Sequence, residues 1–178
     1  MLKAFRSERL NFRPWILADA EAFYDLTKDD GFNAFPITKY RQTSVDSARQ
    51  WIQEAIDLHQ KTGLGKIGVW GEKKNLVGSV GLTPWEWDGE NLVDLMYRIR
   101  SSEWGHGYGT EAAIAITQYA FENLKLKELT ATITPDNAPS IKLAKSLGMK
   151  FEKRITLKGV ETDLFRLPKA NFLKGEKK

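Results

Sequence analysis

Three alternating glycines in the stretch WGHGYGTE at 104–111 are the residues of this chain best suited to hold a ligand. Gly105, Gly107 and Gly109 lack Cβ atoms, so the backbone can turn tightly there and approach a bound group closely. The residues that follow have helical spacing, and the unpaired N–H groups of a first helical turn attract anions. The pattern predicts a phosphate or pyrophosphate site on the amides of residues 105–110. The alternative is a tight turn with a purely structural role.

The glycine spacing differs from that of two common nucleotide-binding motifs. No Lys-Ser or Lys-Thr pair follows the glycines, as a P-loop needs to reach a γ-phosphate and magnesium. A G-x-G-x-x-G match occurs at Gly63, Gly65 and Gly68. It follows a predicted helix and enters a predicted strand, the reverse of the dinucleotide-binding context.

Composition removes most cysteine and histidine chemistry. The 178 residues contain no Cys, which excludes disulfides, thiol nucleophiles and Cys-ligated metal sites. A metal site or a serine–histidine triad would have to use His59 or His106. His59 lies on a predicted helix stripe and is interpreted as a packed or surface histidine, whereas His106 either touches a phosphate or is simply exposed. We therefore expect no metal.

The composition is that of one soluble globular domain spanning residues 1–178. The chain is 42% hydrophobic and 28% charged, with a formal net charge of +4 from scattered basic residues. No apolar run is long enough to span a membrane, and the N-terminus lacks a signal-peptide core. We expect a cytoplasmic protein that binds neither membrane nor nucleic acid, the latter because no basic stripe or aromatic RNA-binding strand is present.

The predicted elements place the glycine turn between a strand and a helix. We expect an α/β (α+β) fold in which a mixed sheet of about seven strands is flanked by about four helices. The predicted strands are 6–13, 66–72, 75–84, 94–100, 128–134, about 149–157 and about 162–167. The predicted helices begin after Asp19, after Thr43–Ser44, after the glycine turn and at Asp136 or Asn137. We interpret residues 83–91 as a loop.

These motifs together resemble the GNAT acyl-CoA N-acetyltransferases, and within them the RimJ/RimL-type branch that includes ribosomal-protein N-terminal acetyltransferases. The resemblance covers nearly the whole chain, in family order and spacing. It is carried by ERLNFRPWILADAEAF (8–23), NLVGSVGL (75–82), DLMYRI (94–99), EWGHGYGTEA (103–112) and PDNAPSIKLAKSLGMKFE (135–152).

The resemblance implies a sheet splayed open between residues 94–99 and 129–134, with acetyl-CoA in the gap. Pantetheine would pair with the backbone of Met96, Tyr97, Arg98 and Ile99. The pyrophosphate would lie on the amides of Gly105, His106, Gly107, Tyr108, Gly109 and Thr110, beside Trp104 at a position where many members have Arg or Gln. Asn137 would contact the pantetheine arm, with Ser140 nearby. Read without the family, Asn137 is a helix cap.

The resemblance also implies direct transfer, in which an amine attacks the thioester, a base takes its proton and a donor protonates the leaving thiolate. Many members carry a tyrosine donor where this chain has Ala144, so Ser140 is our candidate donor; the alternative is a hydroxyl bonded locally in its helix. Asp94 is our candidate base. Glu103 and Glu111 are its rivals, and Glu111 could instead complement the helix dipole.

The acceptor is expected to be a primary amine, either a protein N-terminus such as that of a ribosomal protein or a small amine. Candidate wall residues, which could equally be ordinary core and hairpin aromatics, are Phe32, Phe35, Tyr40, Trp85 and Trp87. The missing tyrosine at position 144 keeps an alternative open, a catalytically inactive CoA-binding or regulatory module. The chain could be a monomer or a homodimer.

Overall fold

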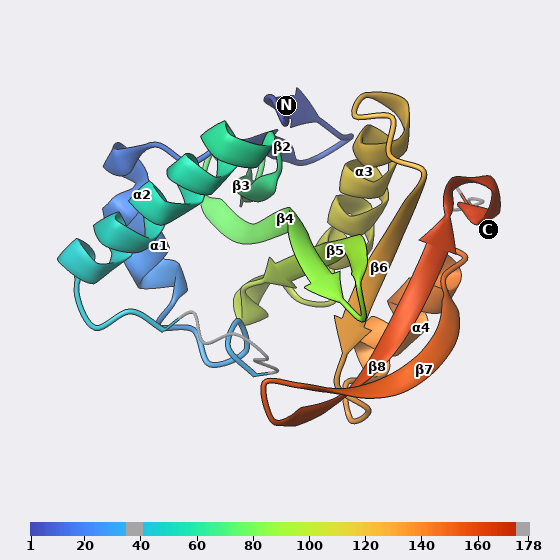
Figure 1. The fold of residues 1–178 in the computed structure, drawn as a ribbon. Coiled ribbons are helices and arrows are strands. Elements are labelled where there is room, and N and C mark those ends of the chain that lie inside the picture. Colours follow the sequence, from blue (N-terminus) through green and yellow to red (C-terminus); the bar gives the residue numbers. More distant parts are fainter. Residues whose placement is uncertain (35–40, 174–178) are drawn as a thin grey trace.

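Eight β-strands and four α-helices make up the part of the chain that the computed structural model describes, residues 1–34 and 41–173 (Figure 1). The strands are β1 (Phe5–Arg6), β2 (Asn11–Arg13), β3 (Gly65–Trp70), β4 (Leu76–Trp87), β5 (Glu90–Ile99), β6 (Glu128–Ile133), β7 (Lys150–Leu157) and β8 (Val160–Pro168). The helices are α1 (Ala20–Leu26), α2 (Val45–Thr62), α3 (Tyr108–Glu122) and α4 (Ala138–Ser146), with short 3-10 turns η1 (Leu17–Asp19), η2 (Ser101–Glu103) and η3 (Lys169–Asn171).

The strands form one mixed sheet in the order β1-β2-β3-β4-β5-β6-β8-β7. Every neighbouring pair is antiparallel except β5 and β6, which are parallel. The expectation of a mixed sheet flanked by helices is confirmed, with eight strands where about seven were expected. Two differences from the predicted elements explain how the sheet is built.

The single strand predicted over residues 6–13 is wrong, because the segment is a small hairpin. Strands β1 and β2 pair with each other, with Phe5 opposite Phe12, and the Ser7 N–H donates to the Leu10 carbonyl at 3.0 Å. The rings of Phe5 and Phe12 stack at 4.5 Å, so the apolar alternation reflects two strands packed side by side. The turn between them projects Ser7 and Arg9 towards helix α3.

The loop predicted over residues 83–91 is also wrong. Strand β4 continues to Trp87 and β5 begins at Glu90, so only Asp88 and Gly89 form the connection. Both residues have positive φ, 52° and 77°, as a two-residue hairpin turn of Asp-Gly type requires. The long hairpin places Trp85 and Trp87 on a strand and brings Thr83 opposite Asp94.

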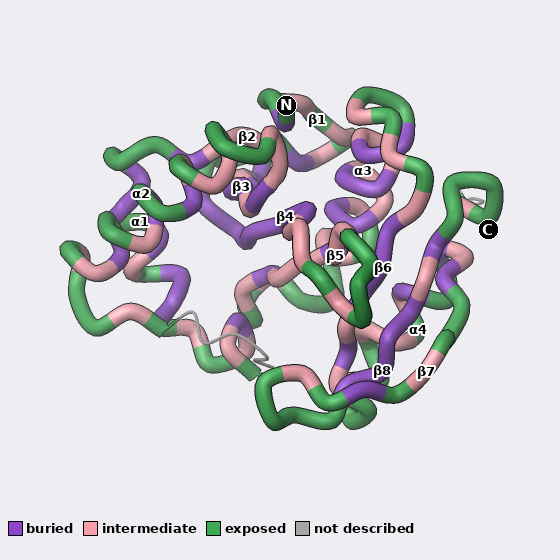
Figure 2. Tube along the Cα trace, viewed as in Figure 1, coloured by how far each residue is buried: buried purple, intermediate pink, exposed green. Residues whose placement is uncertain are grey.

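The two faces of the sheet are covered by different helices. One buried cluster packs Leu95 and Ile99 of β5 with residues of α3 and α4, such as Ile116 and Ala144. On the opposite face, Met96 packs against a second cluster built from α1 and α2. Figure 2 shows buried segments along α3, β4 and β8, whereas the β4–β5 turn is exposed. Successive residues of β5 therefore face alternate sides of the sheet.

Strands β5 and β6 separate along most of their length. Their ladder contains the single register pair Asp94 and Thr130, whereas β4 and β5 are paired from Gly78–Ile99 to Trp87–Glu90. The expected opening of the sheet between residues 94–99 and 129–134 is confirmed (Figure 1). The gap lies beside the glycine turn at the start of α3.

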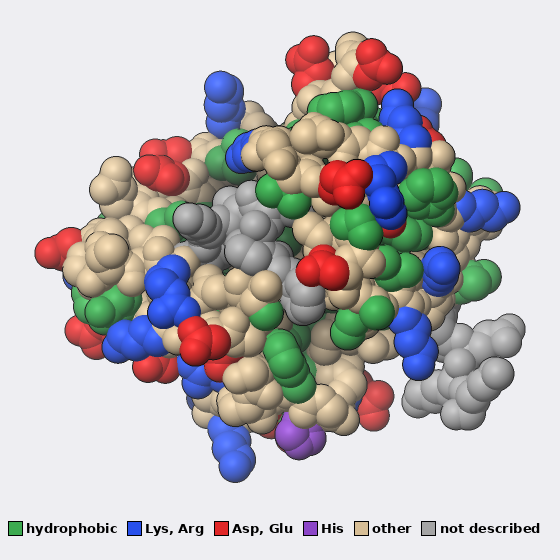
Figure 3. Space-filling view, turned by 90° about the horizontal axis from the view of Figure 1, so that it is seen from below, with side chains coloured by type: hydrophobic (Ala, Val, Ile, Leu, Met, Phe, Trp, Pro, Cys, Tyr) green, Lys and Arg blue, Asp and Glu red, His purple; other side chains and the backbone are tan. Residues whose placement is uncertain are grey.

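The surface gives no sign of an extended basic region on the face drawn in Figure 3, where the described Lys and Arg side chains are interspersed with Asp and Glu. Among the described residues, no helix combines the length and apolar character needed to cross a bilayer. The same part of the chain contains no group of three His, Cys, Asp or Glu side chains placed to hold a metal ion.

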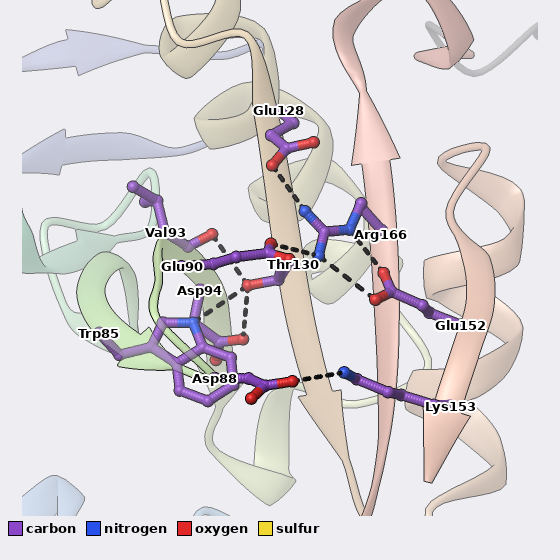
Figure 4. Close-up of polar contacts among 10 residues, drawn as sticks. All are labelled: Trp85, Asp88, Glu90, Val93, Asp94, Glu128, Thr130, Glu152, Lys153 and Arg166. Carbon is purple, nitrogen blue, oxygen red and sulfur yellow. Dashed lines mark hydrogen bonds and ion pairs between the residues drawn. The ribbon is translucent and has the colours of Figure 1, made fainter. Parts of the chain in front are cut away.

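Arg166 of β8 joins the two halves of the opened sheet at its closed end (Figure 4). Its Nη2 atom donates to Glu90 of β5 at 3.0 Å, across β6. Its Nη1 atom donates to Glu128 of β6 at 2.7 Å, and its Nε atom donates to Glu152 of β7 at 2.5 Å. One guanidinium therefore links four strands, including one from each side of the opening.

Replacing Arg166 with Met should destabilise the fold by about 1–2 kcal/mol, because partly exposed ion pairs each contribute up to about 1 kcal/mol. For a domain of this size the melting temperature should fall by roughly 3–6 °C. The hydrogen bond from Arg166 holds the pKa of Glu152 below its usual value. The stabilisation of the folded state by this pair is fully present above the pKa of Glu152 in the unfolded chain, about 4.3. It is lost as the pH falls through the lower pKa of the folded state.

The control is Lys153→Met, since the Lys153 Nζ atom is 4.0 Å from Asp88 in an exposed pair. This change should move the melting temperature by less than about 1 °C. Thermal unfolding of both variants at neutral and acidic pH makes the comparison. Equal losses in the two variants, or an Arg166→Met deficit that grows in acid, would contradict the assignment.

Candidate active site

A cavity of about 890 Å³ passes through the opening between β5 and β6. It is lined from the sheet by residues 94–99 of β5 and 131–134 at the end of β6, and from the helices by the glycine turn and by one side of α4. Phe32, Thr83 and Trp85 line it on the side of α1 and α2, together with Lys66. The cavity therefore connects the two faces of the sheet.

The glycine turn contributes backbone to the cavity wall. Gly105 and Gly107 have φ values of 81° and 79°, in the left-handed region that favours glycine. Gly107 is the N-cap of α3, which has no side-chain cap, so N–H groups of its first turn remain available. Gly105, Gly107, Tyr108, Gly109 and Thr110 line the cavity. Unpaired donors at the start of a 15-residue helix suit a phosphate.

Two residues predicted beside this turn have more specific placements. The His106 side chain is exposed and is not part of the cavity lining. Trp104 does line the cavity, and its Nε1 atom donates to the Ile99 carbonyl at 2.8 Å. Its indole also packs over Gly31, where a Cβ atom would approach the ring to 2.8 Å. Trp104 thereby fixes the start of the turn to the end of β5.

Helix α4 brings Asn137 and Ser140 to the cavity. The Asn137 Oδ1 atom accepts from the Ser140 backbone N–H at 3.2 Å, so Asn137 caps the helix while also lining the cavity. The Ser140 hydroxyl makes no hydrogen bond to any described residue, so the alternative of a locally bonded serine is not observed. Ala144 lines the same wall one turn further along the helix.

Tyr97 extends from β5 towards this helix. Its hydroxyl donates to the Ser140 carbonyl at 3.4 Å, and burial raises the pKa of Tyr97 to about 12. The phenol is therefore protonated throughout the neutral pH range. Sequence reasoning assigned only the backbone of Tyr97, because the position of its hydroxyl depends on how α4 packs across the opening.

Asp94 projects to the opposite face of the sheet (Figure 4). Its carboxylate accepts hydrogen bonds from the hydroxyls of Thr132 at 3.1 Å and Thr130 at 3.4 Å. Burial raises the pKa of Asp94 to about 7, although both hydroxyls act in the opposite direction. Thr130 is itself held by the Trp85 Nε1 atom at 3.2 Å. A carboxylate with this pKa is suited to accept a proton near neutral pH.

Thr83 is a site residue that the sequence analysis missed. It pairs with Asp94 across the β4–β5 ladder, so the two side chains lie on the same face. Its buried hydroxyl oxygen has no hydrogen-bond partner among the described residues, although it lies in the cavity wall. An unsatisfied buried hydroxyl beside a carboxylate offers a polar position to a ligand or water.

The two rivals of Asp94 are placed differently. Glu103 lines the cavity, and its Oε1 atom accepts from Asn75 at 3.5 Å. Glu111 is not part of the lining and instead accepts hydrogen bonds from Ser7 and Arg9. Burial alone would raise the pKa of Glu111, but these hydrogen bonds and the Arg9 charge lower it. A carboxylate that stays ionised and paired is a poor base.

The predicted acceptor wall is brought together only in part. Phe32 and Trp85 line the cavity, whereas Trp87 lies outside it with its ring 6.1 Å from that of Trp85. Phe35 and Tyr40 lie outside the described residues. Lys66 and Lys158 also line the cavity, and sequence reasoning assigned neither of them.

Both a family model and a sequence relative match this chain over most of its length. The model of the acetyltransferase (GNAT) domain family matches residues 9–150. An uncharacterized N-acetyltransferase, p20 of Bacillus licheniformis, is 30% identical over 172 residues, which cover 93% of this chain and 92% of that protein.

Solved structures share the fold at lower identity. A structure of RimL, a ribosomal L7/L12 α-N-protein acetyltransferase in complex with coenzyme A, superposes with a TM-score of 0.81 at 15% identity, covering 93% of this chain and 98% of that one. Mycobacterium smegmatis RimJ in complex with CoA-disulfide gives a TM-score of 0.78 at 18% identity, covering 90% and 82% respectively.

Proposed function

The chain belongs to the GNAT acetyltransferase family, and from this premise we propose that it transfers an acetyl group from acetyl-CoA directly to a primary amine. One observation carries the proposal. A carboxylate able to accept a proton, that of Asp94, lies on one face of the opened sheet. The hydroxyls of Ser140 and Tyr97, able to donate one, lie on the other face, and the cavity connects them.

Two regions of the cavity wall contact different parts of acetyl-CoA in this proposal. The pyrophosphate of acetyl-CoA occupies the amides of residues 105–110, where the helix dipole and free N–H groups favour an anion. The pantetheine arm follows Met96–Ile99 and contacts Asn137, which places the thioester in the opening. The Ile99 carbonyl already accepts from the Trp104 Nε1 atom, which leaves it one lone pair for the arm.

The reaction needs no covalent enzyme intermediate. The nitrogen of the neutral amine, entering on the Asp94 side, attacks the thioester carbonyl, and its proton passes to that carboxylate as the bond forms. A C–N bond forms, the C–S bond breaks, and the electron pair leaves on sulfur as the CoA thiolate. Ser140 or Tyr97 supplies the proton to the thiolate, and solvent restores it. Backbone N–H groups along the opening stabilise the tetrahedral oxyanion.

The acceptor is an amine that can place its nitrogen between Asp94 and Thr83. Trp85 and Phe32 form apolar walls on the same side. RimL, which shares the fold, acts by its name on the N-terminus of a ribosomal protein. A protein N-terminus of this kind is the first acceptor to test, and such an acceptor would place the activity in the cytoplasm.

Acetyl-CoA and CoA should each raise the melting temperature, whereas NAD should not. A ligand at about a hundred times its dissociation constant stabilises the folded state by about 2.7 kcal/mol. For a domain of this size that corresponds to roughly 5–10 °C. Thermal unfolding with acetyl-CoA, CoA, NAD and ATP in parallel measures this. Absence of a shift with both CoA forms would refute the cosubstrate assignment.

Turnover separates an enzyme from a binding module. Release of the CoA thiol is followed with a panel of small primary amines and of peptides with free or blocked N-termini. Thiol release that requires a free amine supports the transferase. The alternative, an inactive CoA-binding module, is based on the absence of Tyr at position 144. Binding of acetyl-CoA without release of the CoA thiol for any acceptor would support this alternative.

A further inference from the structure

The N-terminal hairpin is fastened to the first turn of α3. The Glu111 Oε1 atom accepts from the Ser7 hydroxyl at 2.6 Å and from the Arg9 backbone N–H at 2.8 Å. Its Oε2 atom accepts from the Arg9 Nε atom at 2.8 Å. One carboxylate thus holds three donors from a segment about a hundred residues away in the chain.

The Arg9 guanidinium continues from Glu111 to the glycine turn. Its Nη1 atom donates to the His106 carbonyl at 2.9 Å, and its carbon lies 4.7 Å from the centre of the Tyr108 ring. Its Nη2 atom is 3.5 Å from the position that a Cβ atom on Gly107 would occupy. Arg9 therefore contacts three successive residues of the turn, although it is not part of the cavity lining.

The charges of this pair bear on anion binding at the turn. Glu111 occupies the first turn of α3 and its side chain is only 15% exposed, so an ionised carboxylate lies close to where the cavity meets the helix. The Arg9 side chain, 39% exposed, carries the compensating charge. Without it, the carboxylate would oppose an anion bound to the same helix terminus.

We propose that Arg9 is a positioning residue for the pyrophosphate of acetyl-CoA. It holds the His106 carbonyl on the outer side of the turn, which directs the turn's N–H groups to the cavity, and it neutralises Glu111. This inference rests on the proposed function, because it requires acetyl-CoA to bind at residues 105–110. The site is thereby assembled from the N-terminal hairpin as well as from the glycine turn, and the hairpin sets part of its anion selectivity.

The test compares two acyl donors that differ in the pyrophosphate. Arg9→Met should raise KM for acetyl-CoA about tenfold, the size expected when a favourable charge is lost near a helix terminus. Its kcat should stay within about twofold, because the acyl-transfer groups are untouched. KM for S-acetylpantetheine, which has no pyrophosphate, should not change. Arg6→Met, an exposed arginine on the same hairpin, is the matched control and should leave both KM values unchanged.

Two further variants address folding and charge. Arg9→Lys keeps the charge, but a single ammonium group cannot replace the planar guanidinium that contacts both Glu111 and the His106 carbonyl. This variant should raise KM for acetyl-CoA about threefold without unfolding the hairpin. The double variant Arg9→Met/Glu111→Gln removes both charges and should recover part of the loss seen in Arg9→Met.

Equal losses with acetyl-CoA and S-acetylpantetheine in both Arg9 variants would overturn the proposal, since they would indicate a purely structural role. Unchanged KM for acetyl-CoA in Arg9→Met would overturn it as well. Failure of the proposed function is distinguishable from either result, because the wild-type protein itself would then show no acetyl-CoA binding and no thiol release.

Discussion

Replacing Asp94 with Asn is expected to lower kcat/KM for the amine acceptor by about 10²–10⁴-fold, the contribution typical of a positioned general base. The amide fills nearly the same volume and can still bond to Thr130 and Thr132, but it cannot accept a proton from the attacking amine. Acetyl-CoA binding should stay within about twofold, because the glycine turn and α4 are unchanged. Steady-state kinetics of thiol release and thermal shift with acetyl-CoA provide the two measurements.

The matched control is Glu103→Gln, which removes the other carboxylate of the cavity wall. If Asp94 is the base, this variant should retain activity within about twofold. The opposite ranking, with a large loss in Glu103→Gln and a small one in Asp94→Asn, would assign the base to Glu103.

The pH dependence distinguishes loss of a base from loss of shape. Because burial raises the pKa of Asp94 to about 7, the ionised fraction falls as the pH drops below that value. The wild-type kcat should therefore decrease about tenfold per pH unit on the acid side, and Asp94→Asn should lack this limb. A variant that keeps the acid limb would show that another group titrates.

The same raised pKa has a consequence for stability. Between the unfolded pKa, about 3.9, and about 7, the folded state binds the extra proton, so Asp94 reduces stability as the pH rises through this interval. Asn carries no charge and avoids this cost. At pH values above 7, Asp94→Asn should melt no lower than wild type, and its loss of activity then cannot come from unfolding.

The parts of the site that depend on local sequence could be predicted. The glycine turn, the cap at Asn137 and the opening beside β5 each follow from a motif or from the family that the motifs resemble. The opening also requires that β5 and β6 diverge after the Asp94–Thr130 pair, and the resemblance supplied that expectation.

Thr83 could have been found from sequence. The Asp88-Gly89 dipeptide between two strand-like runs is a strong two-residue hairpin signal. Once that turn is recognised, the register follows by counting outward, and Thr83 falls opposite Asp94. Interpreting residues 83–91 as a loop concealed this pair and placed the tryptophans off the sheet.

Contacts between distant segments could not be predicted in this way. The Arg9–Glu111 pair joins the N-terminal hairpin to α3, and the Tyr97–Ser140 contact joins β5 to α4. No sequence pattern near these residues predicts either pair, because each residue fits the periodicity of its own helix or strand whether or not its partner is present. Their positions depend on tertiary packing across the sheet, which a periodicity argument does not specify.

The donor side of the reaction gives the second large expected effect. Ser140 and Tyr97 present two hydroxyls on the face opposite Asp94, and the Tyr97 phenol, with a pKa of about 12, stays protonated at neutral pH. Because either can protonate the thiolate, Ser140→Ala and Tyr97→Phe should each lower kcat by about tenfold or less. The double variant should lower it by about 10²-fold or more, the range of a lost general acid.

The leaving group provides the control for this double variant. An acetyl thioester of 4-nitrothiophenol releases a stabilised thiolate that needs no proton, so Ser140→Ala/Tyr97→Phe should lose little activity with it relative to wild type. Paired measurements with acetyl-CoA and the aryl thioester, using the same amine, separate proton donation from positioning. An equal loss with both donors would mean that the hydroxyls position the substrate, and an unaffected double variant would mean that water protonates the thiolate.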